Sequence, residues 1–160
     1  MSIAIGDRIP DVELRRMVRK SPEAIRSGEV LGKGKVVLFA VPGAFTPTCS
    51  DYHLPGFVHR ADELFAKGVD TIACISVNDP FVMGAWGRDQ KVGDKVQMLA
   101  DGNGEFTRTM GLEADMTGAG LGARSKRYAA VIDDGVVTAL FVETERGLNV
   151  SSAESVLAAL

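Results

Sequence analysis

Apolar residues in this chain gather in short runs that alternate with amphipathic stretches. Two runs, residues 35–41 and 71–77, are apolar on both faces, which is typical of strands buried inside a parallel sheet. Each run is followed by a stretch in which apolar residues recur at helical spacing, residues 46–67 and 80–86. The order strand, helix, strand, helix predicts parallel βαβ units.

The second half of the chain carries shorter patterns. Strands are expected at residues 96–100, 127–132 and 136–142. The dipeptide Asp134-Gly135 between the last two is a strong hairpin signal. Residues 104–110 predict a short helix, and residues 116–122 predict a glycine-rich loop. Ser151-x-x-Glu154 predicts a capping box that opens the last helix.

Parallel units followed by an antiparallel hairpin and a closing helix predict an α/β fold, with a mixed central sheet flanked by helices on both faces. The thioredoxin-like fold has that order of elements. Residues 1–34 contain short strand-like pieces broken by glycines and prolines. Because no repeat, linker or low-complexity segment divides the chain, residues 1–160 are expected to form a single thioredoxin-like domain.

The net charge of the chain is small. Of its 160 residues, 46% are hydrophobic and 24% are charged, and the net charge at pH 7 is −3. This balance gives no electrostatic reason to expect binding to nucleic acid or to an anionic membrane. No apolar run approaches the roughly 18 residues that a membrane-spanning helix needs. We therefore expect a protein that acts on a small molecule.

Two cysteines, Cys49 and Cys74, are too few for a disulfide framework and do not form a Cys-x-x-Cys pair. The histidines are His53 and His59, and no spacing typical of zinc ligands is present. The N-terminal stretch reaches Asp7 before any apolar segment as long as those of secretory signals. These features favour a reducing, cytoplasmic compartment.

Cys49 lies where the first buried strand is expected to give way to a helix. Thr46 suits the N-cap position, and Pro47 suits the first helical position because its missing N–H would have no partner there. Cys49 then falls in the first turn, where N–H groups lack intrahelical acceptors and the helix dipole is positive. Such a position favours the thiolate over the thiol, which makes Cys49 a candidate nucleophile. Further along, Pro55 is expected to bend the helix.

The spacing Pro-x-x-x-Thr-x-x-Cys, formed by Pro42, Thr46 and Cys49, resembles the active-site signature of the peroxiredoxins, the thiol peroxidases of the thioredoxin-fold superfamily. The stretch Pro-Gly-Ala-Phe-Thr-Pro-Thr-Cys-Ser is similar to the type II, or Prx5-like, subgroup. Further segments resemble the same subgroup in the same order, at residues 56–57, 61–64, 68–69, 75–83 and 120–128. The resemblance covers residues 3–160, nearly the whole chain.

The resemblance implies roles for four residues in a peroxide-reducing site. Cys49 would be the peroxidatic thiolate, which becomes a sulfenic acid. Thr46 would hydrogen-bond the peroxide through its hydroxyl, and Pro42 would shield the thiolate from water. Arg127 would favour the thiolate and hold the oxygen on which charge develops, and Arg124 is the competing candidate for that role. No metal or organic cofactor is required for such a reaction.

The resemblance also implies partners. Hydrogen peroxide and alkyl hydroperoxides are the expected substrates, and glutathione with glutaredoxin, or thioredoxin, is the expected reductant, in a role of antioxidant defence. Related peroxiredoxins of this subgroup often form homodimers near the active-site edge. We expect an apolar patch there that a second copy would cover, formed by Phe45, Pro47, Phe81 and Trp86.

The sequence is also compatible with two other functions. The protein could be a peroxide sensor that passes oxidation from Cys49 to partner proteins. Because His53 follows Cys49 by four residues on the expected helix, a cysteine hydrolase is also conceivable. No signature of an orienting partner or an oxyanion hole accompanies His53, so we interpret it as a structural residue.

Cys74 is not expected to resolve an oxidised Cys49. It lies in the run 71–77, which is apolar on both faces, so its thiol should be buried and its pKa raised. A disulfide needs Cα atoms within about 7 Å, and ladder hydrogen bonds on both sides of a central strand resist such movement. Other members of the subgroup carry a later cysteine in a mobile C-terminal segment, but this chain has none after Cys74. We expect one-cysteine catalysis with an external thiol.

Overall fold

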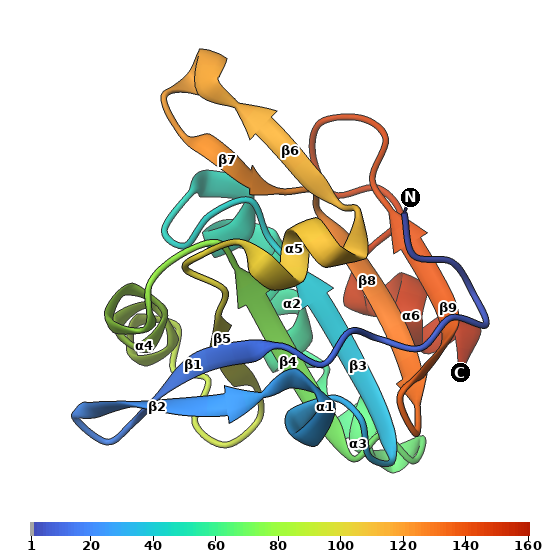
Figure 1. The fold of residues 1–160 in the computed structure, drawn as a ribbon. Helices are drawn as coiled ribbons and strands as arrows, with labels where there is room; N and C mark the ends of the chain where they lie inside the picture. Colours follow the sequence, from blue (N-terminus) through green and yellow to red (C-terminus); the bar gives the residue numbers. More distant parts are fainter. Residues whose placement is uncertain (1) are drawn as a thin grey trace.

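The computed structural model describes residues 2–160, and this part of the chain forms nine strands and six α-helices (Figure 1). The strands are β1 (Glu13–Val18), β2 (Ser21–Arg26), β3 (Lys35–Ala40), β4 (Thr71–Ser76), β5 (Gln97–Ala100), β6 (Glu113–Met116), β7 (Gly122–Ser125), β8 (Tyr128–Asp133) and β9 (Val136–Val142). The helices are α1 (Ser27–Val30), α2 (Leu54–His59), α3 (Ala61–Ala66), α4 (Pro80–Asp89), α5 (Glu105–Met110) and α6 (Ala153–Ala159).

Seven strands form the central sheet, in the order β2-β1-β5-β4-β3-β8-β9. β4 pairs in parallel with β3 on one side and with β5 on the other. The remaining pairs in this sheet are antiparallel, including β3 with β8 and β8 with β9. The predicted mixed sheet of the thioredoxin-like type is therefore confirmed, with β3 and β4 at its centre.

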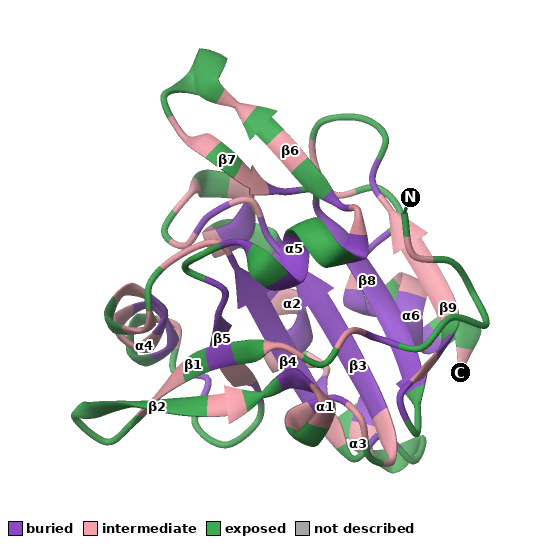
Figure 2. Ribbon diagram, viewed as in Figure 1, coloured by how far each residue is buried: buried purple, intermediate pink, exposed green. Residues whose placement is uncertain are grey.

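The central strands separate two hydrophobic cores. Alternate residues of β3 point to opposite faces, so Val37 and Phe39 enter one core while Val36 and Leu38 enter the other. α2, α3, α4 and α6 cover the first face, and α5 covers the second. In Figure 2, β3, β4 and β8 are buried along most of their length. Burial on both sides explains why the interior positions of these strands are mostly apolar on both faces.

Two local sequence signals have visible partners in the structure, and the hairpin signal at Asp134-Gly135 is confirmed. The Asp79 carboxylate accepts a hydrogen bond from the Val82 N–H at 2.8 Å and caps α4. Asp134 and Gly135 join β8 to β9 with φ angles of 47° and 85°, and two successive positive φ angles are typical of a tight hairpin turn.

The helix expected over residues 46–67 is present but interrupted. Its first residue is Pro47, and residues Cys49–His53 form a π-helical turn closed by a bond from the Leu54 N–H to the Cys49 carbonyl. This widened turn directly precedes Pro55, which has no N–H to donate to the turn before it. A second interruption at Arg60 separates α2 from α3. The structure thus shows a change of helix type directly before Pro55, where a bend was expected.

One prediction for the second half of the chain is incomplete and another is wrong. The glycine-rich loop expected at residues 116–122 is present, but it is the tip of an antiparallel hairpin, β6–β7, whose strands were not predicted and which projects from the rest of the molecule (Figure 1). The last helix begins at Ala153 and not at Ser152, because Ser152, rather than Ser151, caps it by accepting from the Ser155 N–H at 3.1 Å. Ser151 makes other bonds, described below.

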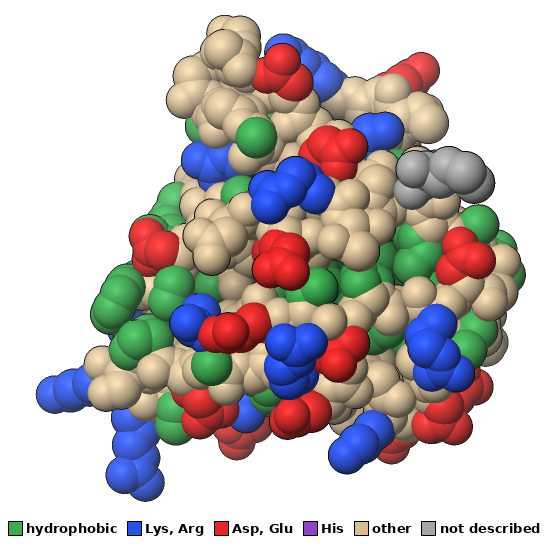
Figure 3. All heavy atoms as spheres, viewed as in Figure 1, with side chains coloured by type: hydrophobic (Ala, Val, Ile, Leu, Met, Phe, Trp, Pro, Cys, Tyr) green, Lys and Arg blue, Asp and Glu red, His purple; other side chains and the backbone are tan. Residues whose placement is uncertain are grey.

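Acidic and basic side chains are interspersed over the face shown in Figure 3, so that face carries no extended patch of one sign. Within the described residues, no helix has the length and apolar character that crossing a membrane would require.

Candidate active site

Cys49 lies at the carboxyl end of β3, in the first turns of the helix that begins at Pro47. Its side chain is fully buried in the first hydrophobic core, next to residues of α2. Residues at the end of the neighbouring strand β4 hold the segment between β3 and this helix in place. The Ala44 N–H donates to the Asn78 side-chain oxygen at 2.9 Å, and the same oxygen accepts from the Ser76 hydroxyl at 2.6 Å.

Thr46 does not make the side-chain capping bond that its position predicts. Its hydroxyl donates to the Gly43 carbonyl at 2.7 Å, and its own carbonyl accepts the first helical bond from the Ser50 N–H at 2.9 Å. A hydroxyl has one proton and two lone pairs. With the proton committed to Gly43, the Thr46 oxygen can act toward a bound molecule only as an acceptor.

Arg127 is brought directly against Cys49. Its Nη2 donates to the Cys49 Sγ at 3.1 Å, and the residue is 9% exposed. A guanidinium remains charged at every working pH, so this contact places a fixed positive charge at the sulfur. Arg127 directly precedes β8, which pairs with β3 and thereby carries the guanidinium to the end of β3.

Arg124, the competing arginine, contacts carbonyl oxygens instead of the thiol. Its Nη1 lies 3.4 Å from the Pro42 carbonyl and 3.3 Å from the Val77 carbonyl, and its Nε donates to the Leu121 carbonyl at 2.8 Å. Pro42 itself is half-buried at the end of β3. Arg124 therefore braces the loops after β3 and β4 against the β6–β7 hairpin.

His53 is buried, and both of its ring nitrogens are occupied. Nε2 lies 2.9 Å from the Ser151 carbonyl, which can only accept, so Nε2 carries the proton and Nδ1 is the acceptor for the Arg127 Nη1 at 2.9 Å. Burial, followed by the charge of Arg127, lowers the pKa of His53 to about 3. The imidazole is neutral at physiological pH, and neither nitrogen is available to take a proton from Cys49. This geometry removes the basis for the hydrolase hypothesis.

Glu143 and Ser151 belong to the same network, although the sequence did not single them out for it. The Glu143 carboxylate accepts from the Ser151 hydroxyl at 2.7 Å and from the Ser151 N–H at 2.8 Å, and both residues are buried. A buried carboxylate draws attention only in a structure, because the sequence alone does not show that Glu143 is buried. Their contacts are developed below.

Cys74 is fully buried in β4 and, like Cys49, forms no disulfide. Burial raises the pKa of the Cys74 thiol well above its usual value, and the charge of the nearby Cys49 raises it further. The location within a central strand and the raised pKa agree with the prediction for this residue.

The apolar patch expected near the site is smaller than predicted. Phe45 and Phe81 are 52% and 60% exposed, and Pro47 is exposed as well. Trp86 is fully buried, which corrects its assignment to the patch. Its indole N–H donates to the Ser50 hydroxyl at 3.0 Å, so the single tryptophan of the chain contacts the turn that carries Cys49.

Among residues 2–160, no three His, Cys, Asp or Glu side chains come together in a way that could hold a metal ion. The site combines a buried thiol, a guanidinium donor 3.1 Å from its sulfur, and the Thr46 hydroxyl as an acceptor three residues before Cys49.

Comparisons with known proteins agree with this description. The family model for Redoxin matches residues 4–157. Peroxiredoxin-2E, chloroplastic, of Arabidopsis thaliana is 50% identical over 163 residues, which cover 99% of this chain and 70% of the relative. Peroxiredoxin-2B of the same plant is 49% identical over 159 residues, covering 99% and 98%. The structure of reduced Prx3 in complex with hydrogen peroxide from Vibrio vulnificus has a TM-score of 0.93 and 52% identity, covering 98% of each chain.

The fold and the buried thiol beside an arginine define a thioredoxin-like redox protein. The chain belongs to the redoxin family and, within it, to the peroxiredoxins of the type II, or Prx5-like, subgroup, which are thiol peroxidases.

Proposed function

We propose that this peroxiredoxin reduces hydrogen peroxide and small alkyl hydroperoxides through the thiolate of Cys49. The sulfur attacks one peroxide oxygen, the O–O bond breaks, and the second oxygen leaves as hydroxide or alkoxide and takes up a proton. Cys49 is left as a sulfenic acid. The observation that carries this proposal is the 3.1 Å contact from Arg127 Nη2 to Cys49 Sγ. The Prx3 relative, whose structure holds hydrogen peroxide, supports the choice of substrate.

The surrounding residues supply what the transition state needs. The Arg127 guanidinium donates to the oxygen on which charge develops, as a preorganised donor in a site closed to water. The Thr46 oxygen accepts a hydrogen bond from the peroxide O–H and orients the O–O bond toward the sulfur. Pro42 and the loop braced by Arg124 shield the thiolate from water.

An external thiol returns Cys49 to its reduced form. The sulfenic acid condenses with that thiol, water is released, and a second thiol reduces the resulting mixed disulfide. We favour glutathione with glutaredoxin as this donor, with thioredoxin as the alternative, because Cys74 is buried in a central strand. A protein that keeps two free cysteines suits a reducing compartment, and we propose the cytoplasm, which cell fractionation would test.

We also propose a homodimer in which a second copy covers the exposed rings of Phe45 and Phe81. Sedimentation over a range of protein concentrations tests this, and a monomer at every concentration would overturn it.

The reductant is identified by peroxide consumption in three mixtures. The protein is supplied with hydrogen peroxide and with thioredoxin plus its reductase, glutathione alone, or glutathione plus glutaredoxin. We expect rapid turnover in the last mixture and loss of all turnover in Cys49→Ser. Fast oxidation of Cys49 with slow turnover in every mixture would favour the peroxide sensor over the antioxidant enzyme.

A further inference from the structure

The buried carboxylate of Glu143 is linked to the Cys49 sulfur by an unbroken series of hydrogen bonds. Glu143 directly follows β9, and its backbone N–H donates to the Arg127 carbonyl at 2.9 Å, which extends the β8–β9 ladder by one bond. The backbone of Glu143 thus lies beside the arginine that contacts the thiol. Its side chain contacts residues 149–151.

A single oxygen of Glu143 organises this segment. Oε2 accepts from three successive backbone N–H groups, of Asn149, Val150 and Ser151, at 2.9, 2.8 and 2.8 Å, and from the Ser151 hydroxyl at 2.7 Å. Consecutive N–H groups that converge in this way form a nest for an anion. Burial raises the pKa of Glu143, but these hydrogen bonds outweigh it and hold the pKa below its usual value. The group is a carboxylate at neutral pH.

These bonds fix the direction of the Ser151 carbonyl. With its N–H and its hydroxyl both held by Glu143, Ser151 is not free to cap α6, and Ser152 does so instead. The carbonyl of Ser151, fully buried, accepts from the Nε2 of His53 at 2.9 Å. A carbonyl in this position selects the tautomer of His53 in which Nδ1 is an acceptor.

The tautomer decides how Arg127 is held. The Nδ1 of His53 accepts from the Nη1 of Arg127 at 2.9 Å, while the Nη2 of the same guanidinium donates to Cys49 at 3.1 Å. A guanidinium is planar and its donors form a rigid fork, so fixing Nη1 also fixes the direction of Nη2. With the other tautomer, Nδ1–H would face Nη1–H, and the two donors would repel each other.

We infer that Glu143 is a positioning residue for peroxide reduction, which acts through Ser151 and His53 to aim the Arg127 guanidinium at the Cys49 sulfur. The inference rests on the proposed roles of Cys49 and Arg127. Glu143 touches neither the thiol nor the peroxide, so its effect on the reaction passes through Arg127.

The test measures the second-order rate constant for oxidation of the reduced protein by hydrogen peroxide, followed by Trp86 fluorescence. Glu143→Met removes the acceptor at similar volume, and we expect a loss of roughly 10- to 100-fold, the scale of an active-site group displaced by about 1 Å. Glu143→Gln keeps an oxygen acceptor without the charge, and a smaller loss is expected. If Glu143→Met oxidises as fast as the wild type, the inference is wrong.

Asp101→Asn is the matched control. The buried Asp101 carboxylate accepts from the N–H of Phe106 at 3.1 Å and from the N–H and hydroxyl of Thr107 at 2.8 and 2.7 Å, at the start of α5. It thus resembles Glu143 in burial and bonding, but its side-chain bonds lead to α5 and not to Cys49. We expect Asp101→Asn to lower thermal stability and to leave the rate constant of the folded protein within about twofold, as for independent sites. A loss as large as that of Glu143→Met would indicate a general effect of destabilisation.

A double-mutant cycle separates positioning from a structural effect. In an Arg127→Gln background, where no guanidinium remains to be aimed, Glu143→Met should slow oxidation by less than about threefold. A full, additive loss in that background would overturn the inference. If Arg127→Gln alone oxidises like the wild type, the proposed function fails instead, and the two failures are thereby distinguished.

The tautomer of His53 gives a readout that needs no activity. The chain has two histidines, so the imidazole ¹⁵N spectrum contains two rings, with the exposed His59 as the reference. We expect a pure Nε2–H tautomer for His53 in the wild type, a mixture in Glu143→Gln and a larger change in Glu143→Met. An unchanged His53 spectrum in both variants would contradict the inference, even if one of them were too unstable for kinetics.

Discussion

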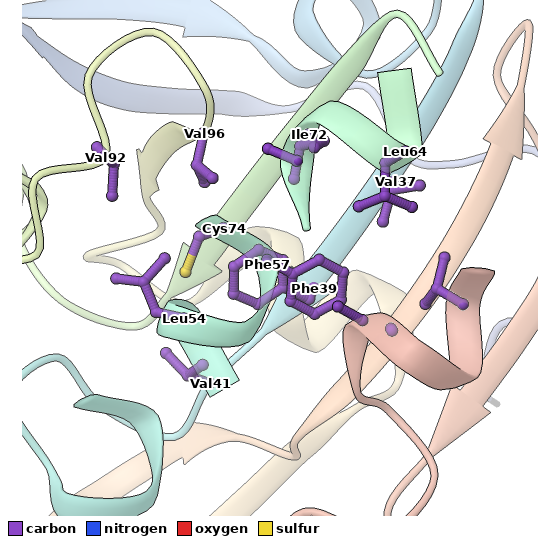
Figure 4. Packing of buried hydrophobic residues seen from close by; sticks show 14 of the residues in the cluster. Val37, Phe39, Val41, Leu54, Phe57, Leu64, Ile72, Cys74, Val92 and Val96 are labelled. Atoms are coloured by element: carbon purple, nitrogen blue, oxygen red, sulfur yellow. The ribbon is translucent and has the colours of Figure 1, made fainter. Parts of the chain in front are cut away.

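Cys74 of β4 lies in register with Phe39 of β3 at the centre of the sheet. The Phe39 ring stacks on Phe57 of α2 with centroids 4.0 Å apart, in the same buried cluster as Cys74 (Figure 4). Cys49 belongs to this cluster as well. β3 and β5 hold β4 on its two sides. The second thiol thus lies in the same core as the first one, but it belongs to a central strand that is paired on both sides.

This location predicts that Cys74 is dispensable for peroxide reduction. Cys74→Ala, which avoids an unpaired buried hydroxyl, should retain most of the wild-type turnover with an external thiol donor. Non-reducing mass spectrometry of peroxide-treated wild type should show little intramolecular disulfide. A near-stoichiometric disulfide between Cys49 and Cys74 would mean that the helix carrying Cys49 unfolds locally and that catalysis uses two cysteines.

The two arginines predict opposite phenotypes. Arg127→Gln removes the donor at 3.1 Å from the sulfur and should slow oxidation of Cys49 by roughly 10²- to 10³-fold, the usual scale for one oxyanion donor. Arg124→Gln removes braces on the Pro42 and Val77 carbonyls, so it should lower the melting temperature more than the oxidation rate. Stopped-flow oxidation and thermal denaturation of both variants check this. The reverse pattern would assign the catalytic role to Arg124.

The bond from the Thr46 hydroxyl to the Gly43 carbonyl predicts how Thr46 can be replaced. Thr46→Ser keeps the proton donor and the acceptor lone pairs, and should oxidise at nearly the wild-type rate. Thr46→Val keeps the shape and loses the acceptor, which should reduce the rate about tenfold, the equivalent of one hydrogen bond. Equal rates in the two variants would show that the hydroxyl does not contact the peroxide.

The buried, neutral His53 predicts a loss of stability in acid. Burial and Arg127 lower the pKa of His53 to about 3. Below pH 6.5 the unfolded chain therefore binds a proton at His53, whereas the folded protein does not bind it until about pH 3. The free energy of unfolding should therefore fall by about 1.4 kcal/mol per pH unit within this window. Glu143, whose pKa is also low when folded, adds to the loss at the acid end.

Urea denaturation between pH 7 and pH 4 measures this slope. His53→Gln should reduce it, while replacement of the exposed His59 should leave it unchanged. A wild-type stability that stays constant from pH 6.5 to pH 4 would contradict the neutral, buried state of His53.

Local signals predicted the transition from strand to helix around Cys49 and the mixed character of the central sheet. Residues 36–41 are all apolar because both faces of β3 are covered, and that pattern is visible in the sequence. Asp79 before Pro80 and Asp134 before Gly135 act on their immediate neighbours, so their effects could also be predicted. The π-helical turn at Cys49–His53 differs from an α-helix only in which carbonyl each backbone N–H binds. No residue in the sequence indicated that difference.

The features that the sequence did not reveal depend on distant partners. Ser151 and Ser152 are equally good N-caps by residue type, and Glu143, eight positions before Ser151, decides between them by binding the hydroxyl of Ser151. His53 could be placed near Cys49 by spacing, but its partners Arg127 and Ser151 lie 74 and 98 residues away. Trp86 is apolar, and apolar character alone does not distinguish a core residue from an exposed patch.

The most direct test of the account asks which sulfur peroxide oxidises. Reduced wild type, Cys49→Ser and Cys74→Ala are each mixed with one equivalent of hydrogen peroxide and a cyclic 1,3-diketone that traps sulfenic acids, and peptide mass spectrometry locates the adduct. Circular dichroism verifies that each variant is folded. The account predicts one adduct, on Cys49, in the wild type and in Cys74→Ala, and no adduct or rapid peroxide consumption in Cys49→Ser. An adduct on Cys74, or wild-type consumption of peroxide by Cys49→Ser, would contradict it.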